Sequence, residues 1–210
     1  MRPLVVKLGG STAGHEEMRE WIDVLVAAGL PLVIVPGGGA FAEQVRISQR
    51  SLHFSDDAAH DMAILAMDQF GIVIAEYHPR LSTAASIEDF RQAWNAGKVP
   101  VWLPSSMTRG AEDIPRSWDV TSDSLAAWLC GQIGAELLLL IKQVDPDDRD
   151  LDEFVKTGVV DPMLPRMLGA KTDLHIAGPS ILRGLRGRFP MIGVPGQHIM
   201  RKVLEGVCRS

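Results

Sequence analysis

Two apolar runs near the start of the chain each stop at a cluster of glycines, and this arrangement constrains the fold more than any other feature. The runs at 5–8 and 32–35 are followed by glycine-rich segments at 9–11 and 37–39. Each pattern predicts a buried strand that turns sharply into a helix. Because glycine leaves backbone N–H groups uncovered, such a turn surrounds an anion with amide donors and the positive end of a helix. Two turns of this kind predict a site where two phosphate-sized anions face each other, as phosphoryl transfer requires.

Further apolar runs alternate with helical patterns along the rest of the chain. Runs that are apolar at every position are typical of strands buried on both faces, as in a parallel sheet covered by helices. The alternation predicts an α/β fold with a doubly wound open sheet. We expect strands at 5–8, 32–35, 72–75, 99–103, 137–141, 174–177 and 191–194, and helices at 15–28, 41–49, 56–70, 87–95 and 122–133. The segment at 105–118 is rich in turn-forming residues and predicts a surface loop.

Composition and charge limit the class of protein. With 210 residues, 46% of them hydrophobic, the chain can form one large α/β domain or two small ones. A net charge of −5 without long basic runs argues against a nucleic-acid partner. Uninterrupted apolar runs such as the one at 137–141 are too short to span a membrane, and we recognise no signal peptide. Cys130 and Cys208 lack metal-binding neighbours, which favours a reducing, cytoplasmic location.

Lys7 lies inside an otherwise apolar strand, directly before the first glycine turn. Burying a lysine costs free energy unless its ammonium group reaches an anion or solvent. We therefore interpret Lys7 as a phosphate ligand, the alternative being a strand-end lysine that reaches water. The triple glycine at 37–39 is either a flexible linker or a nest of amides for an anion. Neither turn has a Walker or GxGxxG pattern, so a dinucleotide fold is not supported.

Polar residues also follow other predicted strands, at the edge of the sheet where open α/β sheets bind ligands. Thr121, Ser122 and Asp123 stand at the start of a predicted helix, and their pattern is typical of a helix N-terminus. Asp123 is also placed to orient a catalytic lysine or a magnesium-bound phosphate. Lys142 follows the strand at 137–141, either to end that strand or to contact a nucleotide.

Other candidates are open to two interpretations. Arg166 lies in a proline-framed segment and is either a surface charge or a phosphate clamp. The six histidines have no metal-binding spacing and are interpreted as surface or core residues. Among them, His60 follows the triple glycine on a predicted helix and is the one placed to contact a substrate.

Four segments, in this order, resemble the amino-acid kinase superfamily, which includes acetylglutamate, aspartate, uridylate and isopentenyl phosphate kinases. They are VVKLGGS at 5–11, LVIVPGGG at 32–39, VTSDSLAAWLC at 120–130 and LLLLIKQVD at 137–145. Within the superfamily, the segments at 36–46, 60–71 and 118–129 are similar to kinases that phosphorylate a furan phosphate in methanofuran biosynthesis. The resemblance covers most of the chain.

This resemblance implies a three-layer αβα sandwich around a mainly parallel open sheet of about eight strands, in a single domain over 1–210. The acceptor would bind over residues 1–110 and ATP over residues 111–210. The implied activity is transfer of the γ-phosphoryl group of ATP to a phosphomonoester, (aminomethylfuranyl)methyl phosphate. Mg²⁺ would be held mostly by phosphates and water, without a protein ligand set.

The resemblance also implies roles for individual residues. Lys7 would neutralise the transferred phosphoryl group, Arg166 would be the second cation, and Asp123 would hold Lys7 and its counterpart in position. The implied nucleotide-binding residues are Gly9, Gly10, Ser11, Lys142, Val144 and Asp145. The implied acceptor-binding residues are Gly37, Gly38, Gly39, Arg46, Thr121 and Ser122. For Arg46 the alternative is a solvent-facing arginine, and Phe41 or Trp118 would provide an apolar wall.

The chain departs from the family pattern at 159–167, where many members have a second lysine and this chain has Arg166. Arginine keeps the charge but presents it as a planar fork, so the exchange is not neutral. This departure keeps two alternatives open: a non-catalytic nucleotide or oxyanion binder on the same fold, and a kinase for an amino acid or a nucleoside monophosphate. We expect a homodimer or higher homo-oligomer, with the apolar helix at 56–70 at the contact.

Overall fold

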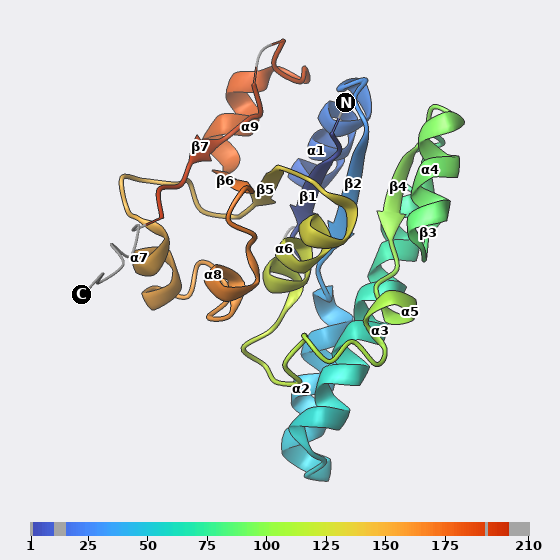
Figure 1. The fold of residues 1–210 in the computed structure, drawn as a ribbon, viewed down its shortest axis with the longest axis vertical. Coiled ribbons are helices and arrows are strands. Elements are labelled where there is room, and N and C mark those ends of the chain that lie inside the picture. Colours follow the sequence, from blue (N-terminus) through green and yellow to red (C-terminus); the bar gives the residue numbers. More distant parts are fainter. Residues whose placement is uncertain (1, 11–15, 192, 202–210) are drawn as a thin grey trace, which may run out of the picture.

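The computed structural model describes residues 2–10, 16–191 and 193–201, which form one seven-stranded sheet (Figure 1). Its strand order is β3-β4-β2-β1-β5-β6-β7, and all neighbours are parallel except β6 and β7. The strands are β1 (Leu4–Leu8), β2 (Leu32–Pro36), β3 (Leu81–Ala84), β4 (Val99–Trp102), β5 (Leu137–Ile141), β6 (Asp173–Ala177) and β7 (Gln197–His198). The expected mainly parallel open sheet is confirmed, with seven strands in these ranges instead of about eight.

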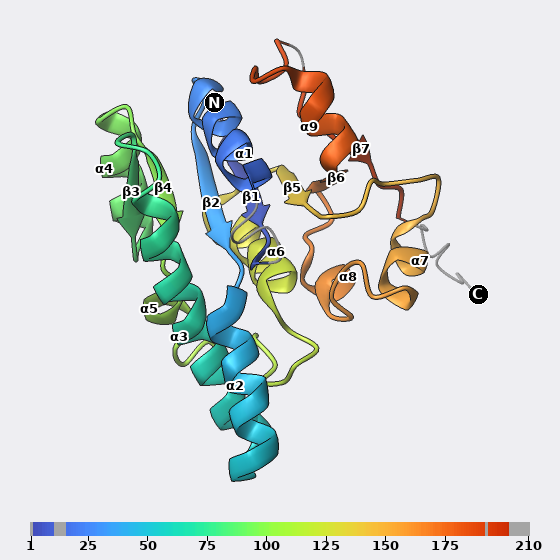
Figure 2. The same ribbon diagram turned by 180° about the vertical axis from the view of Figure 1, so that it is seen from behind.

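Helices cover both faces of the sheet, which makes the three layers of the expected sandwich. One face carries α6 and α8, and the view from behind in Figure 2 shows α1 and α9 over the other. The helices α2 and α3 pack on each other and extend beyond the carboxyl ends of the central strands. The helices are α1 (Glu16–Ala27), α2 (Gly39–Leu52), α3 (Asp56–Ala75), α4 (Ile87–Asn95), α5 (Ser105–Thr108), α6 (Ser122–Ile133), α7 (Leu151–Lys156), α8 (Leu164–Met167) and α9 (Pro179–Leu185).

Side chains of β1 alternate between the two faces, as in any strand, and this alternation aims Lys7. Leu4, Val6 and Leu8 pack in the core that includes α1 and α9. Val5 packs in the opposite core, which includes the buried face of α6. Lys7 is two residues after Val5, so it points toward α6. The alternation of side chains along β1 therefore directs Lys7 toward the N-terminus of α6.

Two of the predicted strands are wrong. The run at 72–75 is the last turn of α3, which continues because Phe70 and Ile74 are buried against the sheet while Ile72 is half exposed. The run at 191–194 is not a strand where the structure describes it, since Met191 is fully exposed and Gly193 has a φ of +79°. Apolar composition alone does not distinguish these segments from buried strands.

Some elements have no clear signal in the sequence. The edge strand β3 is polar at its centre, at Ser82 and Thr83, so it lacks the continuous apolar run of the central strands. The short helices α5, α7, α8 and α9 are also unpredicted, α5 lying within the expected surface loop. The five predicted helices are confirmed as α1, α2, α3, α4 and α6.

By length and composition, α3 would also be able to cross a membrane. Core helices of soluble proteins pass the same test, and 44% of this apolar stretch is buried within the fold.

Candidate active site

The two glycine turns lie against each other at the carboxyl ends of β1 and β2. Leu8 pairs with Pro36 in the parallel ladder, so both turns begin at the same level. A Cβ atom on Gly10 would lie 2.2 Å from the backbone nitrogen of Gly39, and one on Gly37 would lie 2.3 Å from that of Gly10. Only glycine allows two backbones to approach so closely. The two turns therefore converge, as the sequence predicts.

The helix α2 starts directly from the second turn, and no side chain among residues 2–10, 16–191 and 193–201 caps its N-terminus. Gly38 is the N-cap residue, and Gly39, the first residue of the helix, has a φ of +54°. The first backbone N–H groups of a helix have no partner within it and attract anions. An anion at this position would meet amide donors and the positive end of a 14-residue helix.

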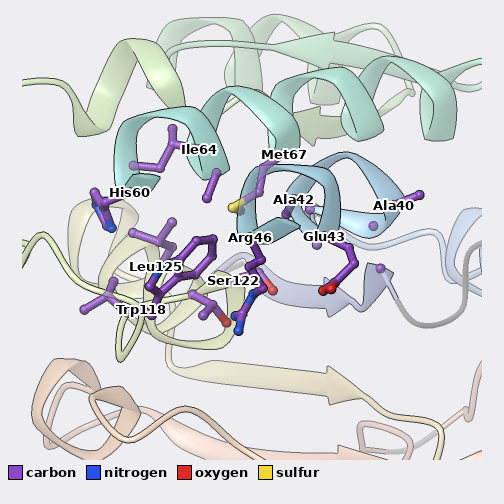
Figure 3. A pocket seen from close by; sticks show the side chains of 17 residues that line it. Ala40, Ala42, Glu43, Arg46, His60, Ile64, Met67, Trp118, Ser122 and Leu125 are labelled. Carbon is purple, nitrogen blue, oxygen red and sulfur yellow. The ribbon is translucent and has the colours of Figure 1, made fainter. Parts of the chain in front are cut away.

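A pocket of about 430 Å³ opens in front of these amides. Figure 3 shows it between α2, α3 and the segment that precedes α6. Its walls combine backbone amides at one end with apolar and aromatic side chains, a combination typical of small-molecule sites. The lining residues that matter below are Gly10, Gly37, Gly38, Gly39, Glu43, Arg46, His60, Ile64, Met67, Trp118, Thr121 and Ser122.

Beside this pocket, two lysines share one buried carboxylate. Lys7 Nζ lies 2.9 Å from Asp123 Oδ1, and Lys142 Nζ lies 2.5 Å from Asp123 Oδ2. Lys7 is the next-to-last residue of β1, Lys142 follows the neighbouring strand β5, and Asp123 is in the first turn of α6. The first strand thus meets, at one point, two consecutive elements that come much later in the sequence. We call these three residues the lysine–aspartate cluster.

The cluster carries a net positive charge in a place with little solvent. Burial alone would raise the pKa of Asp123, but the charges of Lys142 and Lys7 outweigh burial and lower it to about 2. Burial and the charge of Lys7 lower the pKa of Lys142, against the attraction of Asp123. Two ammonium groups facing one carboxylate leave one positive charge, which an approaching phosphate would neutralise.

The N-terminus of α6 is held by a carboxylate from another segment. Asp161 accepts hydrogen bonds from the backbone N–H groups of Thr121 and Ser124, at 2.9 and 3.0 Å, and from the hydroxyl of Thr121 at 2.6 Å. Thr121 is the N-cap residue of α6, as expected, but its own side chain makes no capping bond. Burial, and then the negative charge of Asp123, raise the pKa of Asp161. This capping fixes the helix turn that carries Asp123.

The wall of the pocket opposite Thr121 and Ser122 is built from α2. The guanidinium carbon of Arg46 lies 4.1 Å from the ring centroid of Trp118, a cation–π contact. Trp118 also donates a hydrogen bond from Nε1 to Gln49 Oε1 at 2.8 Å. These contacts fasten the segment before α6 onto α2 and keep Arg46 at the pocket (Figure 3).

The candidate nucleotide-binding residues do not all have free side chains. Asp145 Oδ1 accepts hydrogen bonds from the backbone N–H and the hydroxyl of Ser180, at 2.8 and 2.7 Å, and so caps α9. Val144 is half exposed in the same loop. Gly9 is buried between β1 and Gly10, and Ser11 lies outside the described residues. No group of three or more His, Cys, Asp or Glu side chains in the described ranges is arranged to hold a metal ion.

Arg166 does not join the lysine–aspartate cluster. It is exposed on the short helix α8, whereas both oxygens of Asp123 are engaged by lysines. The sequence interpretation treated Lys142 as a nucleotide contact and did not recognise it as the second partner of Asp123. A signal was present, since Lys7 and Lys142 both stand at the ends of apolar runs that become neighbouring parallel strands. Asp161 had no comparable signal.

Comparisons with known proteins show what the chain is similar to. No protein-family model matches the chain. The (5-(aminomethyl)furan-3-yl)methyl phosphate kinase of Methanocaldococcus jannaschii is 28% identical over 143 residues, 67% of this chain and 66% of that protein. The match thus spans just under two thirds of the relative's length.

Solved structures show the same fold. Uridylate kinase from Archaeoglobus fulgidus superimposes with a TM-score of 0.66 at 20% identity, over 95% of this chain and all of the other. An isopentenyl phosphate kinase gives a TM-score of 0.56 at 16% identity, over 94% and 100% of the two chains. These likenesses show that the chain has the fold of these kinases.

Proposed function

We propose that this protein is an ATP-dependent kinase that transfers the γ-phosphoryl group to a phosphomonoester acceptor. The observation that carries the proposal is the lysine–aspartate cluster beside the paired glycine turns. The cluster supplies positive charge and the glycine turns supply amide donors. In-line phosphoryl transfer needs both, to position the phosphates and to neutralise their charge. The kinases to which the chain is similar support the same reaction class.

The pocket between α2 and α3 is the proposed acceptor site, in the half of the single domain formed by residues 1–110. The acceptor phosphate would bind the amides of Gly38 and Gly39 at the N-terminus of α2, with Arg46 as a further cation. The N–H of Gly37 donates to the carbonyl oxygen of Leu8 at 3.0 Å, so Gly37 would shape the turn and not bind the phosphate through its amide. Trp118 and Met67 form walls that suit a flat ring. A furan-bearing phosphomonoester, such as the one in the name of the M. jannaschii kinase, is the proposed acceptor.

The nucleotide would bind over residues 111–210, at the carboxyl end of β5. Lys142 would contact the phosphates of ATP there, with Gly9 and Gly10 adding amides from the first turn. Because the side chain of Asp145 caps α9, we assign this residue to holding the loop with Val144 beside the nucleotide. Mg²⁺ would arrive on the ATP phosphates, held by their oxygens and by water.

Charge explains how the arrangement would accelerate the reaction. Lys7 and Lys142 stand on either side of Asp123, so they would face the acceptor and nucleotide sides of the transferred group. Positive charge that follows the moving phosphoryl group stabilises the transition state more than the ground state. Asp123 keeps both ammonium groups in place before substrates bind. Asp161 would act one step further away, by fixing the start of α6.

Acceptor-dependent release of ADP tests the proposal. The protein, Mg²⁺-ATP and (5-(aminomethyl)furan-3-yl)methyl phosphate should yield ADP and a diphosphate product, which mass spectrometry identifies. Uridine monophosphate, isopentenyl phosphate and aspartate make up the comparison panel. ATP binding without ADP release on any acceptor would contradict a kinase and favour a non-catalytic nucleotide or oxyanion binder. Release on aspartate alone would contradict a phosphomonoester acceptor.

Two further properties belong to the same proposal. We propose a cytoplasmic enzyme and a homodimer whose contact includes α3, since Met62, Leu65 and Ile72 of this helix are exposed apolar side chains. Sedimentation of the purified protein measures its oligomeric state directly.

A further inference from the structure

The proposed acceptor pocket has a polar group at its far end. His60 of α3 is 5% exposed and lines the pocket with Ile64 and Trp118. Gly39 packs against Phe70, and His60 comes ten residues earlier on α3, which is roughly 15 Å along a helix axis. Figure 3 likewise shows His60 and Ala40 at opposite ends of the pocket. His60 is therefore remote from the transferred phosphoryl group.

One ring nitrogen of His60 is already engaged. Its Nδ1 lies 3.3 Å from the carbonyl oxygen of Ser117, and because a carbonyl only accepts, Nδ1 carries the proton of that bond. Burial lowers the pKa of His60, and the charge of Arg116 acts in the same direction. Together they outweigh the bond to Ser117 and the negative charges of Asp61 and Asp57. The ring is therefore neutral near pH 7, with Nε2 as an acceptor.

The second nitrogen has no protein partner in the described ranges. Nδ1 makes the ring's one hydrogen bond there, which leaves Nε2 available to a ligand. His60 and Ile64 also line a neighbouring cavity of about 250 Å³, so the ring stands where two cavities meet. An acceptor atom on a ring that lines a pocket favours a ligand that brings a donor to it, because a ligand without a donor would displace water and leave the acceptor unpaired.

Resting on the proposed function, we propose that His60 Nε2 selects acceptors that carry an amino or hydroxyl group at the end remote from their phosphate. The phosphate would bind the glycine turn, the body of the molecule would lie along Met67 and Trp118, and the remote N–H or O–H group would donate to Nε2. The substrate named for the M. jannaschii kinase carries an aminomethyl group on its ring. A purely structural His60 would only tie α3 to Ser117.

Two variants separate these roles. His60→Asn keeps a side-chain N–H near the position of Nδ1, for Ser117, and removes the atom at Nε2. His60→Gln places an amide oxygen near the position of Nε2 and restores an acceptor. His78→Asn is the matched control, since His78 contributes no atom to the pocket. The ligands are (5-(aminomethyl)furan-3-yl)methyl phosphate and its analogues with hydroxymethyl or methyl in place of aminomethyl.

Calorimetric affinities without ATP are the main measurement, with ADP release measured in parallel. We expect the wild type and His78→Asn to bind a donor-bearing ligand about tenfold more tightly than the methyl analogue. The ratio of the affinity for a donor-bearing ligand to that for the methyl analogue should fall to about one in His60→Asn and partly recover in His60→Gln. Comparison of the amino and hydroxyl ligands shows which donor is preferred.

The inference and the proposed function fail in different ways. Three results would overturn the role of His60. The wild type would bind the donor-bearing ligands and the methyl analogue equally well, or His60→Asn would leave the ratio of these affinities unchanged, or none of the three ligands would bind. ADP release with an unchanged ratio would leave the kinase assignment intact. Donor-dependent binding without ADP release would support His60 and contradict the kinase.

Discussion

Two helices of this protein begin directly after a strand and a glycine, yet their N-termini are used in opposite ways. At α2, Gly38 precedes the helix, no side chain in the part of the chain that the structure describes caps it, and Gly38 and Gly39 line the pocket. At α9, Gly178 precedes the helix, and Asp145 accepts a hydrogen bond from the backbone N–H of Ser180. The first N-terminus is open to an external anion, and the second is closed by the protein's own carboxylate.

The difference shows that a strand–glycine–helix pattern does not by itself make an anion site. What distinguishes α2 is its surroundings: a second glycine turn in backbone contact with it and the lysine–aspartate cluster nearby. At α9 the residues that approach closely are Val144 and Asp145, since a Cβ atom on Gly178 would meet both. We therefore place the chemistry at the open N-terminus and a structural role at the closed one.

The largest expected effect comes from removing the charge next to the open N-terminus. Lys7→Ala should lower kcat by at least about 10²- to 10³-fold, because a positive charge at the transferred group is lost. The measurement is steady-state ADP release, with circular dichroism to confirm folding. Lys98→Ala, a lysine outside the cluster, is the control. Activity within tenfold of the wild type in Lys7→Ala would place the chemistry elsewhere.

The next comparison is between two cations on the nucleotide side. Lys142→Ala should lower kcat by about 10²-fold, since it contacts Asp123 in the cluster. Arg166→Ala should change kcat by less than about tenfold, because Arg166 is exposed on α8. The reverse order of effects would restore Arg166 as the second cation and would imply that α8 moves when substrates bind.

The third prediction concerns the contact between the two glycine turns. Gly10→Ala should weaken acceptor binding, measured as a KM raised about tenfold, and destabilise the fold by about 1–3 kcal/mol, since the new Cβ would meet backbone 2.2 Å away. Gly131→Ala is the matched control. A Cβ there has no neighbour within 4 Å, and alanine favours a helix. Equal effects of the two variants would show that the close approach of the turns is unimportant.

The smallest effect is expected at the closed N-terminus. Asp145→Ala should lower the free energy of unfolding by about 1 kcal/mol, as loss of a helix cap does, and should leave KM for ATP within about threefold. Chemical denaturation and initial-rate kinetics measure the two quantities. A large rise in KM without loss of stability would mean that Asp145 contacts the nucleotide directly, which would break the comparison between α2 and α9.

Sequence patterns predict the central elements well because these elements obey local rules. Strands β2 and β5 are apolar at every position and β1 at every position except Lys7, and α4 and α6 have the predicted bounds, 87–95 and 122–133. The pattern fails where tertiary packing decides. The run at 72–75 remains helical because its helix is anchored on the sheet by Phe70 and Ile74. The strand β3 forms at the sheet edge although its centre is polar.

The amino-acid sequence alone determined which groups this protein has for the proposed phosphate chemistry: two glycine turns after buried strands, a lysine within the first strand, and an aspartate at the start of a helix. It did so because backbone freedom, strand burial and helix capping depend on neighbouring residues. Only the tertiary structure decided which groups meet. Lys142 forms an ion pair with Asp123, while Asp145 and Asp161 accept hydrogen bonds at the N-termini of α9 and α6. These contacts depend on the register of parallel strands and on loops distant in the chain.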